Sequence, residues 1–399
     1  MPNHTASTAP SKALISMGYI VCIFGVIYGL ILHMDLWTLG SDGFSIVSHT
    51  SPYWDFNNLW TGGRLALENN TDALFNMESY RAHMDRLLAQ NVPDQEWSYP
   101  PNMLLIGTPL ALLPVFWAYW LWTLGTIAAL HFALRPFKLR PLIHIAVLLS
   151  PAVFLNALFG QNGALLAALL LGGLVLAPQR PIIAGILIGL MTIKPHLGIL
   201  IPFCFIASRN WTAFASAAIT SALLFLVTAL PFGFDVWSQF LQHTQPMMSD
   251  IMHGTFPQSY HGNAVTVFVF CRMLGGNLLA AYGLQAVFSL ACIASVIWLW
   301  RPTAPIQHID RVALTCVLAL LATPYGYTYD MIGLSAAIAI ICSRHAPITL
   351  TPLLILVWTF PFYNHLLFAQ HKLTLGAIIL LATALLLYRT TKTTAPQLA

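Results

Sequence analysis

The chain has 399 residues, of which 58% are hydrophobic and 8% charged, whereas a soluble domain carries roughly 25% charged residues. A water-soluble globule of this size is excluded, because so few charges cannot cover its surface and the apolar residues fall in long runs. The formal charge of +4 is too small and too dispersed to indicate a nucleic-acid partner. The composition predicts an all-α, polytopic integral membrane protein with residues 1–399 in one membrane domain.

Apolar runs between charges, prolines and polar clusters predict about twelve transmembrane helices. The first, residues 13–33, is long enough to cross a bilayer and lacks a small-residue cleavage pattern, so we expect a membrane span rather than a secretory signal. The others are residues 114–134, 141–158, 163–177, 181–193, 197–207, 211–230, 279–300, 312–323, 330–343, 346–362 and 373–389. Several fall short of the roughly 20 residues that a bilayer requires, which indicates a cavity within the membrane zone.

The distribution of charge predicts the orientation of these spans. If both termini are cytoplasmic, most basic residues face the cytoplasm, where Asp310 is the single acidic residue. These basic residues are Lys12, Arg135, Lys138, Arg140, Arg180, Arg209, Arg301, Arg311, Arg344, Arg389 and Lys392. We therefore expect a multi-pass protein of the plasma (inner) membrane with both termini in the cytoplasm.

Two hydrophilic segments, residues 34–101 and 231–276, are predicted to fold outside the bilayer on the outer side. In the first, which holds most of the acidic residues, apolar spacing predicts short amphipathic helices over residues 56–68 and 77–90. In the second, residues 263–274 are too short to span and are predicted to form a surface helix at the interface. The clustering of acids favours an active site at the outer face of the membrane.

Asp55 stands apart from the other acidic residues because Tyr53, Trp54 and Phe56 flank it. Aromatic neighbours indicate a position against the bilayer interface, where loss of water raises the pKa of a carboxyl toward values that suit a general base. Asp55 equally suits the N-cap of a helix that begins at Phe56. The two roles are compatible, and the residues alone leave both open.

Lys194 interrupts an apolar stretch and is followed by Pro195. A lysine at the bilayer centre costs about 2.5–3.5 kcal/mol, so such residues commonly face a cavity or a partner, and the proline ends the helix there. The pattern favours a cation that binds phosphate, with a lysine that snorkels to the interface as the alternative.

Three further residues are candidates for contacts with a phosphate. Arg272 is a possible second cation, or else a contact to phospholipid headgroups. His196 and His261 suit hydrogen bonds to phosphate or sugar hydroxyls, although single histidines at such places are more often structural.

Polar and aromatic residues of the predicted outer segments and turns are candidates for contacts with a sugar or an acceptor. Gln161 and Asn162 offer amides in a very short turn, where their alternative role is to close a helical hairpin. Asn263 and Tyr327 are further candidates, and the rings near Tyr327 suit either sugar stacking or an interfacial aromatic belt. Tyr99 begins a rigid Tyr-Pro-Pro re-entry into the membrane.

Four motifs together carry a family resemblance. They are Asp55-Phe56 running into Gly62-Gly63-Arg64, Tyr99-Pro100-Pro101, Phe159-Gly160-Gln161-Asn162-Gly163, and Gly185 to Gly189 followed by Lys194-Pro195-His196. In these the chain resembles glycosyltransferase family 87, over about residues 50–215 and elsewhere by topology. The family belongs to the GT-C superfamily of polytopic enzymes, so the resemblance implies a GT-C-type fold.

The resemblance also implies a reaction. In that superfamily a sugar carried on a polyprenyl phosphate is transferred, with inversion, to an acceptor hydroxyl outside the membrane, and a carboxylate of the first outer loop is the general base. Asp55 occupies the matching position, and Lys194 suits stabilisation of the departing phosphate. The implied partners are membrane lipid, a polyprenyl-phosphate hexose, with mannose taken from the family alone, and a glycolipid or glycan acceptor.

Other chemistries find less support. No Asp-x-Asp pair occurs, so we expect neither the metal-bound nucleotide site of soluble glycosyltransferases nor another cofactor. The cysteines stand singly, mostly in apolar runs, which favours buried free thiols. Broken helices also fit a secondary transporter or lipid flippase, and an inactive scaffold of a glycan-assembly complex is a third hypothesis. The two unlike halves of the chain, with acids gathered in one outer loop, favour the enzyme.

Overall fold

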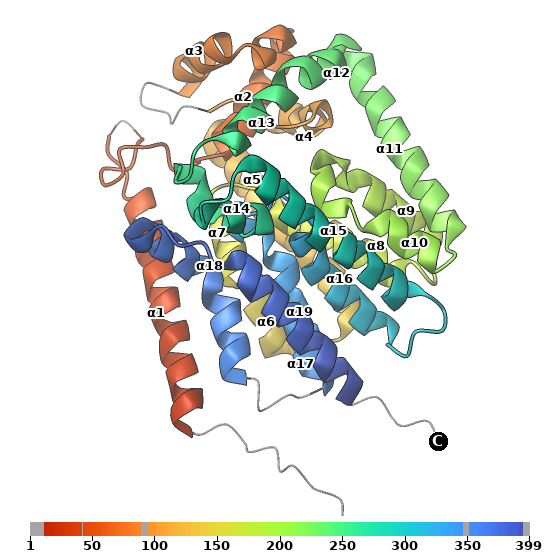
Figure 1. Cartoon of the computed structure of the whole chain (residues 1–399). Coiled ribbons are helices and arrows are strands. Elements are labelled where there is room, and N and C mark those ends of the chain that lie inside the picture. Colours follow the sequence, from red (N-terminus) through yellow and green to blue (C-terminus); the bar gives the residue numbers. More distant parts are fainter. Residues whose placement is uncertain (1–11, 42, 89–94, 346–350, 394–399) are drawn as a thin grey trace, which may run out of the picture.

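The computed structural model describes residues 12–41, 43–88, 95–345 and 351–393, and these residues form helices and turns with no β-sheet. The long helices lie together as a bundle (Figure 1). The start of α1 (Lys12–Trp37) and the end of α19 (Gly376–Thr393) lie at one end of it. Helices α2 (Phe56–Leu67), α3 (Met77–Leu88) and α12 (Asp235–Gln239) lie at the other end. The two hydrophilic segments therefore share one end, opposite the outermost described ends of the chain.

The remaining α-helices follow in chain order. Those of the first half are α4 (Leu104–Leu110), α5 (Val115–Leu134), α6 (Pro141–Leu148), α7 (Pro151–Leu158), α8 (Gly163–Leu176), α9 (Pro181–Leu190) and α10 (Ile201–Ala207). Those of the second half are α11 (Trp211–Phe232), α13 (Gln245–His253), α14 (Val267–Met273), α15 (Leu278–Trp300), α16 (His308–Ala322), α17 (Ile332–His345) and α18 (Thr351–His371).

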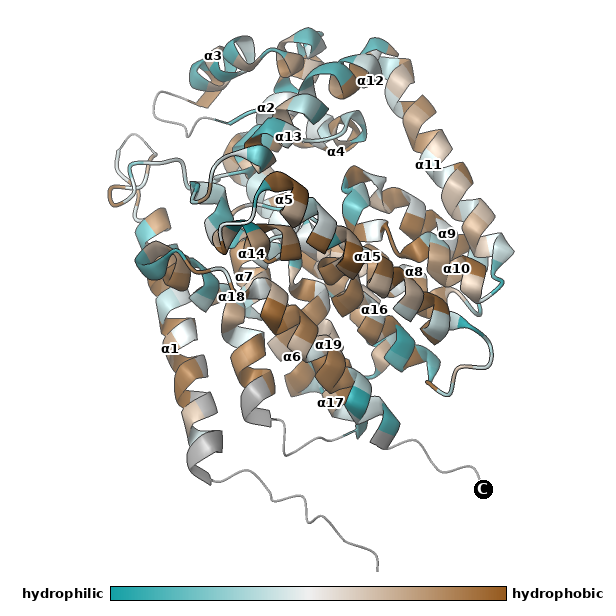
Figure 2. Ribbon diagram, viewed as in Figure 1, coloured by the Kyte–Doolittle hydropathy of each residue, from teal (hydrophilic) through white to brown (hydrophobic). Residues whose placement is uncertain are grey.

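Within the described residues, four helical stretches are long and apolar enough to cross a membrane. They are Val115–Phe137, Pro141–Leu158, Trp211–Phe232 and Leu278–Trp300. Shorter apolar helices accompany them, among them Gly163–Leu176 and Pro181–Ile193. Figure 2 shows hydrophobic colour along α15, α16 and α19 and hydrophilic colour on α3 and α12. The expectation of a helical multi-pass membrane protein is confirmed, and the count of twelve spans stays a prediction.

Local sequence explains why several helices are short. The span expected over residues 141–158 is interrupted between α6 and α7, where the Ser150 side chain accepts a hydrogen bond from the backbone N–H of Val153 and Pro151 begins the new helix. After α9 the chain tightens into the 3₁₀-helix η4 (Met191–Ile193), and η5 (Pro195–Gly198) follows. Lys194 lies between the two in a non-helical conformation, so the break predicted at Lys194 is confirmed.

The segment between α1 and α4 is a packed unit. The two amphipathic helices expected there are confirmed as α2 and α3. Helix α2 crosses α4 at glycines. A Cβ added at Gly63 would lie 2.1 Å from the carbonyl oxygen of Gly107, so the two backbones can approach this closely only because no side chain separates them. The Tyr80 hydroxyl of α3 donates a hydrogen bond to the carbonyl oxygen of Asn58, 2.9 Å away, and Tyr80 is fully buried. These contacts give the start of α2 a fixed position.

The prediction of a surface helix over residues 263–274 is right about the presence of a helix and wrong about its length and its position at the surface. The chain there forms the 3₁₀-helix η7 (Ser259–Asn263) and then α14, whose Phe268 is fully buried. Helix α14 packs against α15, and the Gln285 side chain accepts a hydrogen bond from the backbone N–H of Phe268 at 3.0 Å. That amide satisfies one of the free donors at the start of α14, which makes burial of a short helix possible.

Asp310, the single acid expected on the cytoplasmic side, is buried and paired with bases. Its carboxylate oxygens lie 2.7 Å from Nε of Arg344 and 3.1 Å from Nε2 of His345. The pairing joins α16 to α17 near the end of the bundle where α19 ends. It explains how one carboxylate is accommodated in an otherwise basic region.

Candidate functional site

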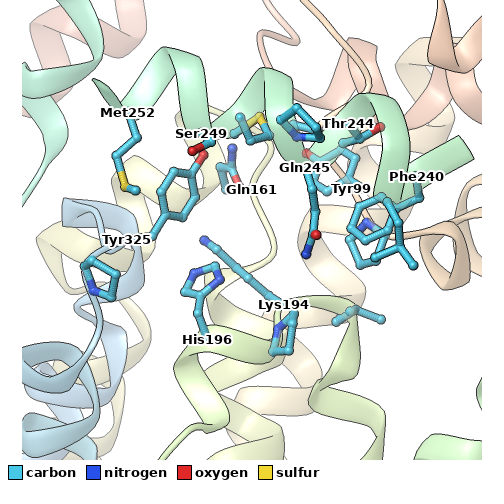
Figure 3. Close-up of a pocket in the computed structure, with 18 of the residues that line it drawn as sticks. Tyr99, Gln161, Lys194, His196, Phe240, Thr244, Gln245, Ser249, Met252 and Tyr325 are labelled. Carbon is cyan, nitrogen blue, oxygen red and sulfur yellow. The ribbon is translucent and has the colours of Figure 1, made fainter. Parts of the chain in front are cut away.

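A cavity of about 640 Å³ lies between helix ends of the bundle and the two hydrophilic segments (Figure 3). The volume falls in the range of about 300–1,000 Å³ that is usual for small-molecule sites. One side is formed by Tyr99, Gln161, Lys194 and His196, which come from three separate breaks between helices. All four are residues that the sequence singled out, and the fold brings them together around one space.

Asp55 lies directly behind this wall. It occupies the N-cap position of α2, yet its side chain makes no capping hydrogen bond. Instead Oδ2 accepts a hydrogen bond of 2.6 Å from Nε2 of Gln161, and Oδ1 accepts one of 3.2 Å from Nε2 of Gln95. The carboxylate is therefore directed toward the turn that lines the cavity and away from the helix that it precedes.

The turn that carries Gln161 is fixed against the start of α2. Gly160 has φ +62°, and a Cβ there would lie 2.4 Å from Cβ of Phe56, so glycine is required on both counts. Nε1 of Trp122 donates to the carbonyl oxygens of Gly160 and Gln161, at 3.2 and 3.3 Å. These contacts hold the Gln161 amide on the Asp55 carboxylate.

The environment of Asp55 alters its acidity. Burial raises the pKa of Asp55 above its ordinary value, and the hydrogen bond from Gln161 and the positive charge of Lys194 oppose that rise. Lys194 is therefore close enough for its positive charge to favour the ionised form of this carboxyl. A carboxyl with a raised pKa suits a general base that works near neutral pH.

Lys194 is not a free cation. Its Nζ lies 2.6 Å from Oδ1 of Asp330 and 5.1 Å from the centre of the Tyr329 ring. Both charged side chains are almost fully buried, so the Lys194 side chain does not extend to the surface as a snorkelling lysine would. An ammonium has three donors, and after the bond to Asp330 two remain for an anion in the cavity.

Aromatic rings of the turn before α17 complete this wall. Tyr325 and Tyr329 line the cavity, and Tyr325 meets the His196 ring edge-on with 5.1 Å between centroids. Tyr327 is stacked on Tyr329 at 5.3 Å and lies behind it. Tyr327 therefore supports the wall, whereas the rings of Tyr325 and Tyr329 face the cavity.

The roof of the cavity comes from residues that sequence reasoning missed. The π-helical turn η6 (Phe240–Thr244) and α13 pass over the space, and Thr244, Gln245 and Ser249 line it (Figure 3). They are uncharged and occur in a segment without a motif. The sequence signal that could have indicated them is the amphipathic pattern of residues 245–253, which is typical of a helix on the surface of a site. In the structure α13 has no fully buried residue.

Three other predicted residues lie away from the cavity walls. Arg272 donates to the carbonyl oxygens of Gly276 and Gly254, at 3.1 and 3.2 Å, and so links α14 to the end of α13. Burial and the charge of Arg272 lower the pKa of His261 to about 4, which leaves this histidine neutral at pH 7. Asn263 accepts a hydrogen bond from the Thr328 hydroxyl at 3.3 Å.

Asn162 is 2% exposed and lies beside Gln161 at the start of α8. Both polar atoms of its side chain are buried and have no hydrogen-bond partner among the described residues. Nε2 of His196 is in the same situation. Unsatisfied buried polar groups are uncommon, and these two lie in the turn and the helix break that form the cavity wall.

The helices and the cavity define a multi-pass membrane protein with a substrate-sized site, lined by both apolar and polar residues, at one end of its bundle. The chain belongs to glycosyltransferase family 87, whose sequence model matches residues 97–324. No curated protein and no solved structure matches the chain. The family resemblance is confirmed, and with it the class of enzyme: a glycosyltransferase acts on a sugar donor and an acceptor.

The matched region differs in extent from the expected residues 50–215. It continues to residue 324 and so includes Gln161, Lys194, His196 and the roof of the cavity. It begins at residue 97, so Asp55 lies outside it. Asp330 also lies outside it, so any role of these two residues depends on their hydrogen bonds to Gln161 and Lys194.

Proposed function

We propose that this protein transfers a hexose, with mannose as the first candidate, from a polyprenyl phosphate to a hydroxyl of a glycolipid or glycan acceptor. The observation that carries the proposal is the shared site of two opposite charges: the Asp55 carboxylate bound by Gln161 and the Lys194 ammonium on the cavity wall. Family membership supplies the reaction class. The donor, the sugar and the acceptor are part of the proposal.

The proposed reaction begins at the acceptor. Asp55 takes the proton of the acceptor hydroxyl, and the oxygen of that hydroxyl attacks the anomeric carbon of the donor. The bond from that carbon to the phosphate oxygen breaks on the opposite face, so the configuration inverts. The electron pair leaves with the polyprenyl phosphate, which carries the added negative charge.

Lys194 stabilises that charge in the proposal. Its remaining two N–H donors face a leaving phosphate while Asp330 keeps the ammonium in place. A buried ammonium held by a carboxylate needs no rearrangement when the charge develops. This geometry supports a reaction in which no metal neutralises the phosphate.

We propose the GT-C-type arrangement for the whole chain, in the plasma (inner) membrane. The cavity then opens at the outer face, both termini are cytoplasmic, and residues 34–101 and 231–276 are the outer loops. The support is the location of α2, α3 and α12 at the end of the bundle opposite the end of α19 (Figure 1). Basic residues concentrated on one side agree with this orientation.

The test is transfer by purified protein in detergent. Synthetic polyprenyl phosphates that carry mannose, glucose, galactose or arabinose are supplied with membrane glycolipids as acceptors, with and without EDTA. We expect a labelled glycolipid and free polyprenyl phosphate from one of these donors, at a rate that EDTA leaves unchanged. Movement of the lipid-linked sugar across sealed vesicles without any transfer would contradict the proposal and favour the transporter.

Gln161 allows a test through pH. The Gln161→Ala variant loses a hydrogen bond that favours the ionised carboxylate, so the pKa of Asp55 rises further above its ordinary value. Asp55 must be ionised to accept a proton, so the acidic limb of the kcat/KM profile moves to higher pH, by about one unit for a bond to a charged group. The measurement is that profile over pH 4 to 9.

Gln245→Ala is the matched control, because Gln245 lines the cavity without a hydrogen bond to Asp55. It is expected to change KM and to leave the acidic limb in place. An acidic limb that stays unmoved in Gln161→Ala as well would show that Asp55 is not the titrating group.

A further inference from the structure

A second cavity, of about 550 Å³, lies among α15, α16 and α19. Its walls are almost entirely apolar and include Phe288, Leu318, Leu381 and Leu385. None of the residues of the polar site lines it. A cavity of this volume and composition, on helices that form the apolar part of the bundle (Figure 2), suits a hydrocarbon chain.

Two aromatic residues close one end of this cavity. Trp298 of α15 and Tyr388 of α19 both line it, and their rings meet edge-on with centroids 5.8 Å apart. Tryptophan and tyrosine are the residues that concentrate where a bilayer meets water, since their rings are apolar and their tips polar. This pair of rings therefore suits a position at the headgroup level.

Two cations gather over the same rings. Cζ of Arg301 lies 5.3 Å from the centre of the Trp298 ring, and Nζ of Lys392 lies 4.8 Å from Tyr388 and 5.9 Å from Trp298. Both basic residues are exposed, and neither has an ion-pair partner within the part of the chain that is described. The apolar cavity thus ends at uncompensated positive charge.

We infer that this cavity binds an anionic phospholipid, with one acyl chain between α15 and α19 and the phosphate between Arg301 and Lys392. Charge complementarity selects the occupant, because a zwitterionic headgroup brings its own cation to the two basic side chains. Basic pockets between membrane helices are known to bind anionic headgroups. The site is separate from the proposed reaction, so its lipid is a structural ligand of α15 and α19.

The experiment is native mass spectrometry of the full chain, titrated with phosphatidylglycerol or with phosphatidylcholine of the same acyl chains. We expect the first phosphatidylglycerol molecule to bind more tightly than those that follow it. Phosphatidylcholine should show no such tight first binding step. The Arg301→Gln/Lys392→Gln variant should weaken that step by about thirtyfold in Kd, the effect of two basic residues near an anionic headgroup. Transfer activity should be unaltered.

Two further variants keep the inference falsifiable. Arg135→Gln/Lys138→Gln removes one Arg and one Lys that are exposed after α5, away from the cavity, and should bind phosphatidylglycerol as the unaltered protein does. Ala291→Trp fills the apolar wall and should abolish the tight step while both cations remain. Equal loss in both double variants would overturn the inference, as would displacement of phosphatidylglycerol by one equivalent of polyprenyl phosphate.

Discussion

Replacement of Asp55 by Asn is expected to lower the rate of sugar transfer by about 10²–10⁴-fold, the usual contribution of a general base. Asn keeps the size of the side chain and an oxygen that accepts from the Gln161 amide, so the turn should stay docked on α2. It cannot accept the acceptor proton. The measurement is kcat with a saturating lipid-linked donor, beside the thermal unfolding midpoint, which should change little.

Asp85→Asn is the control, because Asp85 is an exposed carboxylate of the same outer segment, on α3. It removes the same charge from the same side of the protein and is expected to retain full activity. An Asp55→Asn protein that turns over at the normal rate would remove Asp55 from the mechanism. The family assignment, which depends on residues 97–324, would be unaffected.

The second large effect is expected at the buried pair of Lys194 and Asp330. Lys194→Met leaves the Asp330 carboxylate buried without its partner, and breaking such a pair costs about 3–5 kcal/mol. Stability should therefore fall together with donor affinity. The measurements are the thermal unfolding midpoint in detergent and the Kd for a polyprenyl-phosphate sugar.

A double variant separates these two losses. Lys194→Met/Asp330→Asn removes both charges. In the unaltered protein the backbone N–H of Tyr327 donates to Oδ2 of Asp330 at 3.1 Å, and the amide oxygen of the variant can accept the same hydrogen bond. We expect most of the stability to return and the donor affinity to remain low. Recovery of both quantities would show that the pair is purely structural and that the phosphate binds elsewhere.

Much of the helical framework was predictable because it follows from hydropathy. The apolar runs over residues 114–134, 211–230 and 279–300 correspond to α5, α11 and α15 within two residues at either end. The break at Lys194 was predictable for a similar reason, since proline and a charge end a helix locally. Each of these signals lies within a few residues of the feature that it predicts.

The pairings of the candidate site were harder to predict because they join distant parts of the chain. Lys194 was expected to meet a phosphate, whereas its ammonium is paired with Asp330, 136 residues further on. Gln161 was expected to contact a sugar, whereas its amide is bound to Asp55, 106 residues away. Neither distance leaves a periodic signal in the sequence.

Helix α14 shows how a tertiary partner overrides a local pattern. Residues 263–274 were predicted to form a surface helix because the stretch is too short to span the membrane, whereas the helix that forms, α14, is partly buried and has free N–H donors at its start. Gln285 of α15 supplies the acceptor that local reasoning lacked. The first half of α14 consequently packs against α15, and Arg272 donates to the carbonyl oxygens of Gly276 and Gly254.

The π-helical turn η6 sets which side chains of the roof face the cavity. Such a turn holds one residue more than the α-helix on either side of it, so it offsets everything that follows by one position. Removing a single residue from Phe240–Thr244 would swing Gln245 and Ser249 by about 100° about the helix axis. Insertion or deletion at this point would therefore exchange the whole set of groups above the substrate at once, while leaving Asp55 and Lys194 untouched beneath it.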